Sequence, residues 1–187
     1  HSPLVASLGT LQATFVHPLC GIRPTGNAVH LRIAEVHHSN ETGRLARSWI
    51  WVDLLDLMGQ AGLYPLPPML GAPGLWPGPK GGFGARFETT DNFEGAKSLA
   101  RVLAMHDGLF KFDGISITSM PMDAWAPDFM YYAAAGIGTS RGLAGFRAHH
   151  QIPFLRAFPD RRGAGHFVRI GDGPFAVTGG RVAVTHK

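Results

Sequence analysis

The chain has 187 residues, of which 45% are hydrophobic and only 16% are charged, so the composition argues against a disordered tail and supports a folded core. The net charge of +4 comes from scattered Arg and Lys residues, without the basic stripe that nucleic-acid-binding modules carry. No apolar run approaches the ~20 residues that span a bilayer, and the single cysteine fits a reducing compartment. We therefore expect a soluble, cytoplasmic protein with no membrane or nucleic-acid partner.

The first 62 residues predict strands followed by one short helix. Strand character occurs in three stretches: 4–16, with a kink at Gly9, 28–38 and 44–52. The segment 17–27 holds two prolines and two glycines and predicts a loop, whereas SNETG at 39–43 predicts a hairpin turn. Asp53 stands where a helix would begin, and apolar residues follow at helical spacing up to Gly62. The pattern is that of a hairpin with a closing helix.

Residues 63–90 are rich in proline and glycine, which forbids a long helix or a central strand and predicts a linker. From Asp91 an acidic first turn and regular apolar residues predict a helix. The residues expected to form its apolar face are Phe93, Ala96, Ala100, Leu103 and Phe110. The chain therefore divides into 1–62, the linker and 91–187.

The rest of the second half predicts helix before strands. A strand ends the stretch 123–132, and GIGTSRG at 136–142 predicts a loop that enters a helix. That helix, 143–158, should be kinked by Pro153. Three short strands are expected after it, at 165–170, 175–178 and 181–185.

These pieces carry a resemblance to a known family. The run PDFMYY, then GTSRGLAGFR, then FLRAFPD resembles the opening half of SnoaL-like polyketide cyclases, members of the nuclear transport factor 2-like superfamily. GIRPTG, followed by a strand and GRLARSWIWVDLLDLMGQAG, resembles the closing half of that family, in which a strand ends in Trp-Asp-x-x-Asp and a helix ends in Gln-x-Gly. The closing half precedes the opening half here, as in a fragment of a tandem protein.

The resemblance implies an α+β fold, a cone-shaped barrel in which a curved, mostly antiparallel sheet packs on helices. Two arrangements stay open: a permuted cone closed within one chain, or a cone shared between two chains in a homodimer. The implied partner is a small hydrophobic or aromatic molecule. In the cyclase branch an acid/base group removes a proton beside a carbonyl without any cofactor, which requires a base and a donor to the enolate oxygen.

The family's catalytic aspartate falls on Ile50, which cannot carry a proton. Its second aspartate is kept as Asp53, for which a helix N-cap is the favoured interpretation. Two polar pocket positions fall on Ile33 and Glu35, and strand alternation places Glu35 on the face of apolar neighbours. Glu35 is thus a candidate base, with a surface ion pair as the alternative. A pocket asparagine of the family aligns with Tyr131, a candidate donor or a core tyrosine.

His150 is a further candidate acid, base or polar anchor on the second helix, with helix packing as the alternative. Neighbouring histidines, as at 37–38 and 149–150, point in different directions, so we predict no metal site. The expected pocket wall consists of Ile33, Ile50, Trp49, Trp51, Trp125, Met130 and Phe146. Because Ile50 replaces the family's aspartate, a noncatalytic binding or assembly module competes with the enzyme hypothesis.

Overall fold

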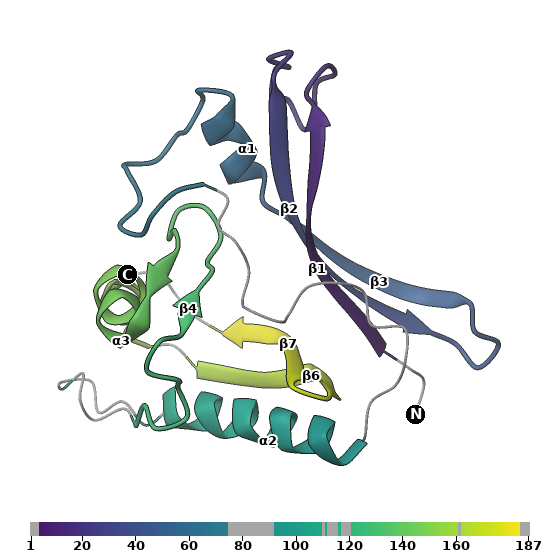
Figure 1. The fold of residues 1–187 in the computed structure, drawn as a ribbon, viewed down its shortest axis with the longest axis vertical. Helices are drawn as coiled ribbons and strands as arrows, with labels where there is room; N and C mark the ends of the chain where they lie inside the picture. Colours follow the sequence, from purple (N-terminus) through teal and green to yellow (C-terminus); the bar gives the residue numbers. More distant parts are fainter. Residues whose placement is uncertain are drawn as a thin grey trace. The chain divides into compact units, whose positions relative to one another are not determined.

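The structure, a computed structural model, describes residues 4–74, 92–109, 111, 116, 121–160 and 162–183. The chain divides into two compact units: the first contains residues 1–77 and 132–139, and the second contains residues 78–131 and 140–187. Within the described ranges the strands form three separate antiparallel sheets and close no barrel (Figure 1). The fold class is therefore α+β, as the sequence predicts.

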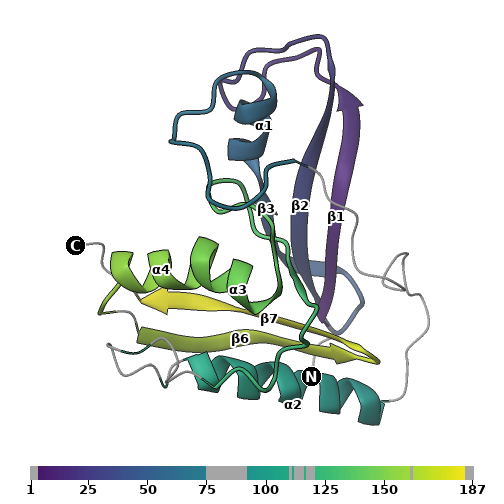
Figure 2. The ribbon, with the colours of Figure 1, turned by 60° about the vertical axis from the view of Figure 1, so that its left-hand side comes forward.

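The first unit is built on a three-stranded sheet in the order β1-β2-β3 (Figures 1 and 2). β1 (Leu4–Thr14) pairs with β2 (Ala28–Ser39) along its whole length. The pairing continues through Gly9 without a register shift, so β1 has no bulge at this glycine. β3 (Leu45–Val52) pairs only with the second half of β2, where Val52 lies opposite Ile33.

The turn between β2 and β3 follows from its polar sequence. The side-chain oxygen of Asn40 accepts hydrogen bonds from the backbone N–H groups of Thr42, at 3.1 Å, and Arg44, at 2.9 Å. Gly43 has a φ of 76°, a backbone conformation that favours glycine. Asparagine and glycine thus supply the turn chemistry that sets this hairpin, and the predicted turn is confirmed.

Helix α1 (Leu54–Gln60) lies along the part of β2 that β3 leaves unpaired. The Asp53 side chain accepts a hydrogen bond from the Asp56 N–H at 3.1 Å, which confirms the predicted N-cap. The apolar face of α1 completes the core of the unit. That core consists of buried Phe15, Ile22 and Leu57, with partly buried Val29, Leu31, Leu54, Met58 and Ala61 around them.

Two glycines join the described part of the predicted linker to the 132–139 loop in the first unit. The Gly71 N–H donates to the Ile137 carbonyl at 2.9 Å, and Ala72 and Thr139 exchange backbone hydrogen bonds. A Cβ on Gly138 would lie only 2.6 Å from the Gly71 carbonyl carbon. Residues without side chains are therefore required at this contact.

The second unit places helix α2 (Asn92–Leu109) against the hairpin formed by β6 (Arg162–Asp172) and β7 (Phe175–Ala183) (Figure 2). Helix and strand meet at Gly95 and Gly171, where a Cβ on Gly95 would lie 2.5 Å from the Gly171 carbonyl oxygen. The missing side chains allow the two backbones to approach closely.

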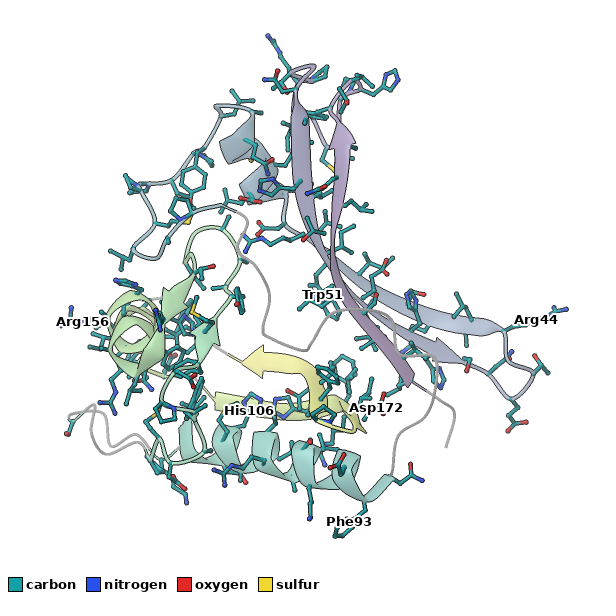
Figure 3. All side chains as sticks on the ribbon, in the orientation of Figure 1. Arg44, Trp51, Phe93, His106, Arg156 and Asp172 are labelled. Atoms are coloured by element: carbon teal, nitrogen blue, oxygen red, sulfur yellow. The ribbon has the colours of Figure 1, made fainter. Side chains whose placement is uncertain are left out.

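This close contact selects a different helix face from the one predicted. Phe93 is 63% exposed and points away from the hairpin, whereas His106 points toward it (Figure 3). Ala96 and Ala100 are also exposed, and Phe110 lies outside the described residues. Of the predicted apolar face, Leu103 is half-buried. The prediction is wrong for Phe93, Ala96 and Ala100, because the close packing at Gly95 places a different side of the helix on the hairpin.

The second predicted helix is present in three consecutive parts: α3 (Gly142–Phe146), a π-helical turn (Arg147–Gln151) and α4 (Ile152–Ala157). Pro153 has no N–H to continue the α-helical pattern, and the wider turn directly precedes it. The irregularity is confirmed, although it takes the form of a π-turn.

The last strands differ from the prediction of three short ones. β7 runs through Gly179 and Gly180 as one strand, because both glycines pair across to β6. Pairing therefore overrides the turn tendency of the Gly-Gly sequence. The end of the predicted strand, 184–185, lies outside the described residues.

Candidate functional site

A chain of contacting rings is the main feature of the second unit. It is organised by a short ribbon of β4 (Met130–Tyr131) and β5 (Ser140–Arg141), followed directly by α3. The Gly142 N–H donates to the Phe129 carbonyl at 2.8 Å, which joins the start of α3 to the residue before β4. The rings of this cluster, called the ring cluster below, are Trp125, Phe129, Tyr131, Phe146, His150, Phe154 and Phe158.

Tyr131 and His150 lie at the centre of the ring cluster. Their rings are stacked, with centroids 4.9 Å apart and planes inclined by 30°. Phe146, which is 3% exposed, meets the Tyr131 ring edge-on at 4.9 Å and the His150 ring at 5.4 Å. Trp125 packs on the same phenylalanine at 4.8 Å. The structure thus brings together four residues that the sequence nominated for a site.

Burial favours the neutral forms of both titratable rings. It raises the pKa of Tyr131 above its ordinary value of 10.0 and lowers the pKa of His150 below 6.5. Around pH 7 the phenol is therefore a hydrogen-bond donor and the imidazole an unprotonated acceptor. Within the described part of the chain, neither side chain has a hydrogen-bond partner that would occupy these groups.

Met130, the remaining candidate of the second half, lies beside Tyr131 in the two-residue strand β4 and is half-buried. Because neighbouring residues of a strand point to opposite faces, Met130 and Tyr131 do not share one face of the ribbon. Met130 pairs across the ribbon with Arg141, whereas Tyr131 pairs with Ser140.

Glu35 lies in the first unit, on β2, and its surroundings match the surface alternative. Its carboxylate accepts a hydrogen bond from the Ser7 hydroxyl at 3.0 Å and lies 3.6 Å from the His37 Nε2. The Glu35 side chain retains a third of its accessible area, and the His37 ring is held on its other side by Ser48 at 2.8 Å. These contacts hold Glu35 in a polar row along the sheet.

The pocket-wall residues of the first half divide between two faces of the sheet. Glu35 lies opposite Ile50 in the pairing of β2 with β3, so these two share a face with Ile33. Trp49 and Trp51 flank Ile50 and point to the other face. Ile50 is 56% exposed and Trp51 is 51% exposed. The structure therefore does not gather these five residues around one space.

Sequence reasoning missed a polar network in the first unit, centred on Arg32. The guanidinium of Arg32 lies 2.7 Å from the Asp53 carboxylate and donates to the Ala133 carbonyl at 2.7 Å. The same carboxylate accepts the Ala135 N–H at 2.9 Å. Asp53 thus caps α1, pairs with a cation and holds the 132–139 loop. The available signal was Arg32 itself, a charged residue between the apolar Leu31 and Ile33 of the predicted strand.

Gln60 continues this network along the edge of β2. Its side-chain amide accepts the His30 N–H at 2.9 Å and donates to the His30 carbonyl at 2.7 Å, in the manner of a neighbouring strand. It also donates to Asp56 at 3.2 Å. Burial raises the pKa of Asp56 above its ordinary 3.8, against the opposing effect of the Arg32 charge. The network closes the sheet edge where β3 ends.

A shallow groove of about 420 Å³ lies between α2 and the β6–β7 turn, lined by Lys97, Ser98, Arg101, Val102, Pro174 and Ala176. Its polar groups already have protein partners. The Ser98 hydroxyl donates to the Gly173 carbonyl at 2.6 Å, Arg101 donates to the Asp123 carbonyl at 2.9 Å, and Lys97 lies over a phenylalanine ring. Of these contacts, the Ser98–Gly173 hydrogen bond joins α2 to the hairpin.

No group of three or more His, Cys, Asp or Glu side chains among the described residues is arranged to hold a metal ion. None of the described helices is both long and apolar enough to cross a membrane. Comparison with known proteins found no matching family model, no matching curated protein and no matching solved structure. The function must therefore be argued from the geometry of the chain itself.

Proposed function

We propose that the second unit binds a small hydrophobic or aromatic molecule against the ring cluster, with the Tyr131 hydroxyl and the His150 imidazole at the polar end of the ligand. The observation that supports this is the stacking of two neutral, unpaired polar rings within a row of aromatic side chains. Such rings offer π faces to a planar molecule and a small number of polar groups that fix its orientation.

The finer part of the proposal is a SnoaL-like fold. Its support is the motif order: PDFMYY, GTSRGLAGFR and FLRAFPD supply most members of the ring cluster. In this proposal the sheets of the two halves of the chain form part of a cone-shaped nuclear transport factor 2-like barrel. That barrel is completed within one chain or between the two chains of a homodimer.

Binding is tested with 1,8-dihydroxyanthraquinone as an aromatic, polyketide-like probe, measured by titration calorimetry. Tyr131→Phe removes only the hydroxyl and should weaken binding about threefold to tenfold, the effect of one lost hydrogen bond. Tyr132→Phe, the same change at the next residue, is the matched control and should bind as the wild type does. If the wild-type chain bound neither this probe nor a steroid probe, the proposal would be overturned.

A second candidate function is proton transfer on the bound molecule, supported by the directions of the two pKa shifts. The neutral His150 would accept a proton from carbon beside a carbonyl, while Tyr131 would donate a hydrogen bond to the enolate oxygen that forms. His150 takes this role in place of Glu35, whose carboxylate is held by Ser7. The noncatalytic module remains the competing function.

These two candidates are separated by deuterium exchange of the carbon-bound protons of 2-tetralone in D₂O, followed by NMR. Catalysis predicts exchange that is lost in His150→Phe and that declines as the pH falls through the lowered pKa of His150, where the base becomes protonated. Binding of the anthraquinone without any exchange of the ketone would instead support the binding module.

A further inference from the structure

Ser140 is a buried polar residue for which the fold provides no partner. It is 5% exposed, and its hydroxyl has no hydrogen-bond partner among the described residues. A buried hydroxyl without a partner costs stability, so most are satisfied in folded proteins. The Trp125 indole N–H is buried without a partner in the same part of the chain. These two donors are unused by the folded protein.

The position of Ser140 links it to the ring cluster. It lies directly opposite Tyr131 in the antiparallel pair of β4 and β5, so the two side chains share one face of the ribbon with Cβ atoms roughly 5 Å apart. Trp125 joins the same cluster through Phe146. A ligand that lies against the Tyr131 ring is therefore on the same face of the ribbon as the Ser140 hydroxyl.

The helix that follows packs closely against Ser140. Gly145 of α3 faces it, and a Cβ on Gly145 would lie 3.3 Å from the Ser140 Cβ, closer than side chains ordinarily pack. Glycine at 145 therefore allows the helix to approach the serine without displacing it. The protein retains a small, polar and unpartnered position at the edge of an otherwise aromatic cluster.

We infer that Ser140 is a specificity-determining residue of this site, whose hydroxyl donates a hydrogen bond to a carbonyl oxygen of the ligand beside the Tyr131 hydroxyl, with Trp125 as a second donor. The inference rests on the proposed binding function. A donor left unpaired in the free protein discriminates strongly between ligands, because a ligand without an acceptor leaves it unpaired. The site thus selects aromatic ketones over hydrocarbons of the same shape.

The test compares 2-acetylnaphthalene with 2-ethylnaphthalene, two probes of similar shape that differ in the carbonyl oxygen. Wild-type protein should bind the ketone about tenfold more tightly, the effect of roughly one hydrogen bond. Ser140→Ala should reduce this preference to less than about threefold while binding of the hydrocarbon is unchanged, and Ser140→Thr should restore part of it. Trp125→Phe should also reduce the preference for the ketone over the hydrocarbon.

Thermal unfolding without ligand provides a second readout. Ser140→Ala should keep or raise the midpoint, because it removes an unsatisfied hydroxyl. Ser98→Ala, which removes a hydroxyl bonded to Gly173, is the matched control and should lower it. If Ser140 had only a structural role, Ser140→Ala would lower the unfolding midpoint and leave the preference for the ketone probe unchanged. That result would overturn the inference.

The outcomes also separate the inference from the function on which it rests. Equal binding of both probes by the wild type overturns the role of Ser140 and leaves the binding site in place. Absence of binding for both naphthalenes overturns the role of Ser140, and the anthraquinone titration then shows whether the proposed function fails with it.

Discussion

Asp53 and Asp56 are three residues apart at the start of α1, yet their charges have opposite consequences. The Asp53 carboxylate forms an ion pair with the Arg32 guanidinium at 2.7 Å and accepts hydrogen bonds from two backbone N–H groups. Asp56 is 7% exposed, and the nearest side-chain nitrogens of His30 and Arg32 lie 3.8 Å and 3.9 Å from its carboxylate. The pKa of Asp56 is raised by burial, so its environment favours the neutral acid.

This contrast predicts opposite effects for the same substitution at the two positions. Asp56→Asn should keep an acceptor for Gln60 and remove a buried charge, so that stability at pH 7 is unchanged or raised by roughly 1 kcal/mol. Asp53→Asn should lower stability by roughly 3 kcal/mol, because Arg32 loses its compensating charge. Urea unfolding at pH 7 followed by circular dichroism measures both changes.

The pH dependence of the Asp56 effect has a defined sign. Because the pKa is higher in the folded state, the stability contributed by the protonated carboxyl is fully present below 3.8 and is lost as the pH rises through the raised pKa. The advantage of Asp56→Asn should therefore shrink toward zero as the pH approaches 3.8. An advantage that grows on acidification would contradict the assignment.

At the scale of elements, the contact between α2 and β6 is decided by glycines. The backbones approach so closely at Gly95 and Gly171 that either Cβ would overlap the other residue's carbonyl group. Glycine within a helix normally costs about 1 kcal/mol relative to alanine, so the sequence alone would mark Gly95 as a weakness. The packing explains its presence and the exposure of Phe93 on the opposite side.

Gly95→Ala should therefore destabilise the second unit by about 2 kcal/mol, since the overpacking cost exceeds the gain in helix propensity. Gly108→Ala is the matched control on the same helix. A Cβ there would lie 3.3 Å from the Pro121 carbonyl oxygen, so a small adjustment suffices and the change should be near neutral. If urea unfolding showed that both variants are equally stabilised relative to the wild type, the close contact at Gly95 would contribute nothing to the free energy of unfolding.

Local signals predicted the elements of the first unit because their chemistry is contained within a few residues. Asp53 caps the helix it begins, and Asn40 and Gly43 form the turn they occupy. Such local signals do not predict contacts between residues that are far apart in the sequence. The face of α2 depends on Gly171, and the single strand β7 depends on pairing that carries it through Gly179.

The candidate site likewise contains residues that the sequence indicated and one residue that it did not. Tyr131 was found through motif resemblance and His150 through its place on the predicted second helix, and the structure stacks their rings. Ser140 lies in GIGTSRG, which the sequence indicated only as a loop entering a helix. Its importance depends on the partner that it lacks, and a missing partner is visible only after the surrounding chain has folded.

At the scale of the whole molecule, the part of the chain that the structure describes has one strand edge without the usual protection, the outer edge of β1. Among the described residues, the backbone of this eleven-residue strand bonds to no strand except β2. β1 contains neither a charged residue nor a proline, whereas β3 carries Arg47. Charges and prolines are the usual means of preventing edge-to-edge association. Leu8 and Leu11, which are 84% and 59% exposed, add apolar surface to this edge.

We therefore predict that the chain associates in a concentration-dependent manner through β1. Leu8→Lys should shift the equilibrium strongly toward the monomer, because a lysine on the edge strand would lose its hydration in a strand–strand contact. Leu45→Lys, at a leucine of β3 that is 68% exposed, is the matched control and should have a much smaller effect, since that strand already carries a charge. Light scattering over a concentration series measures the difference. Equal association of wild type and Leu8→Lys would exclude β1 and direct the search to the exposed faces of the sheet.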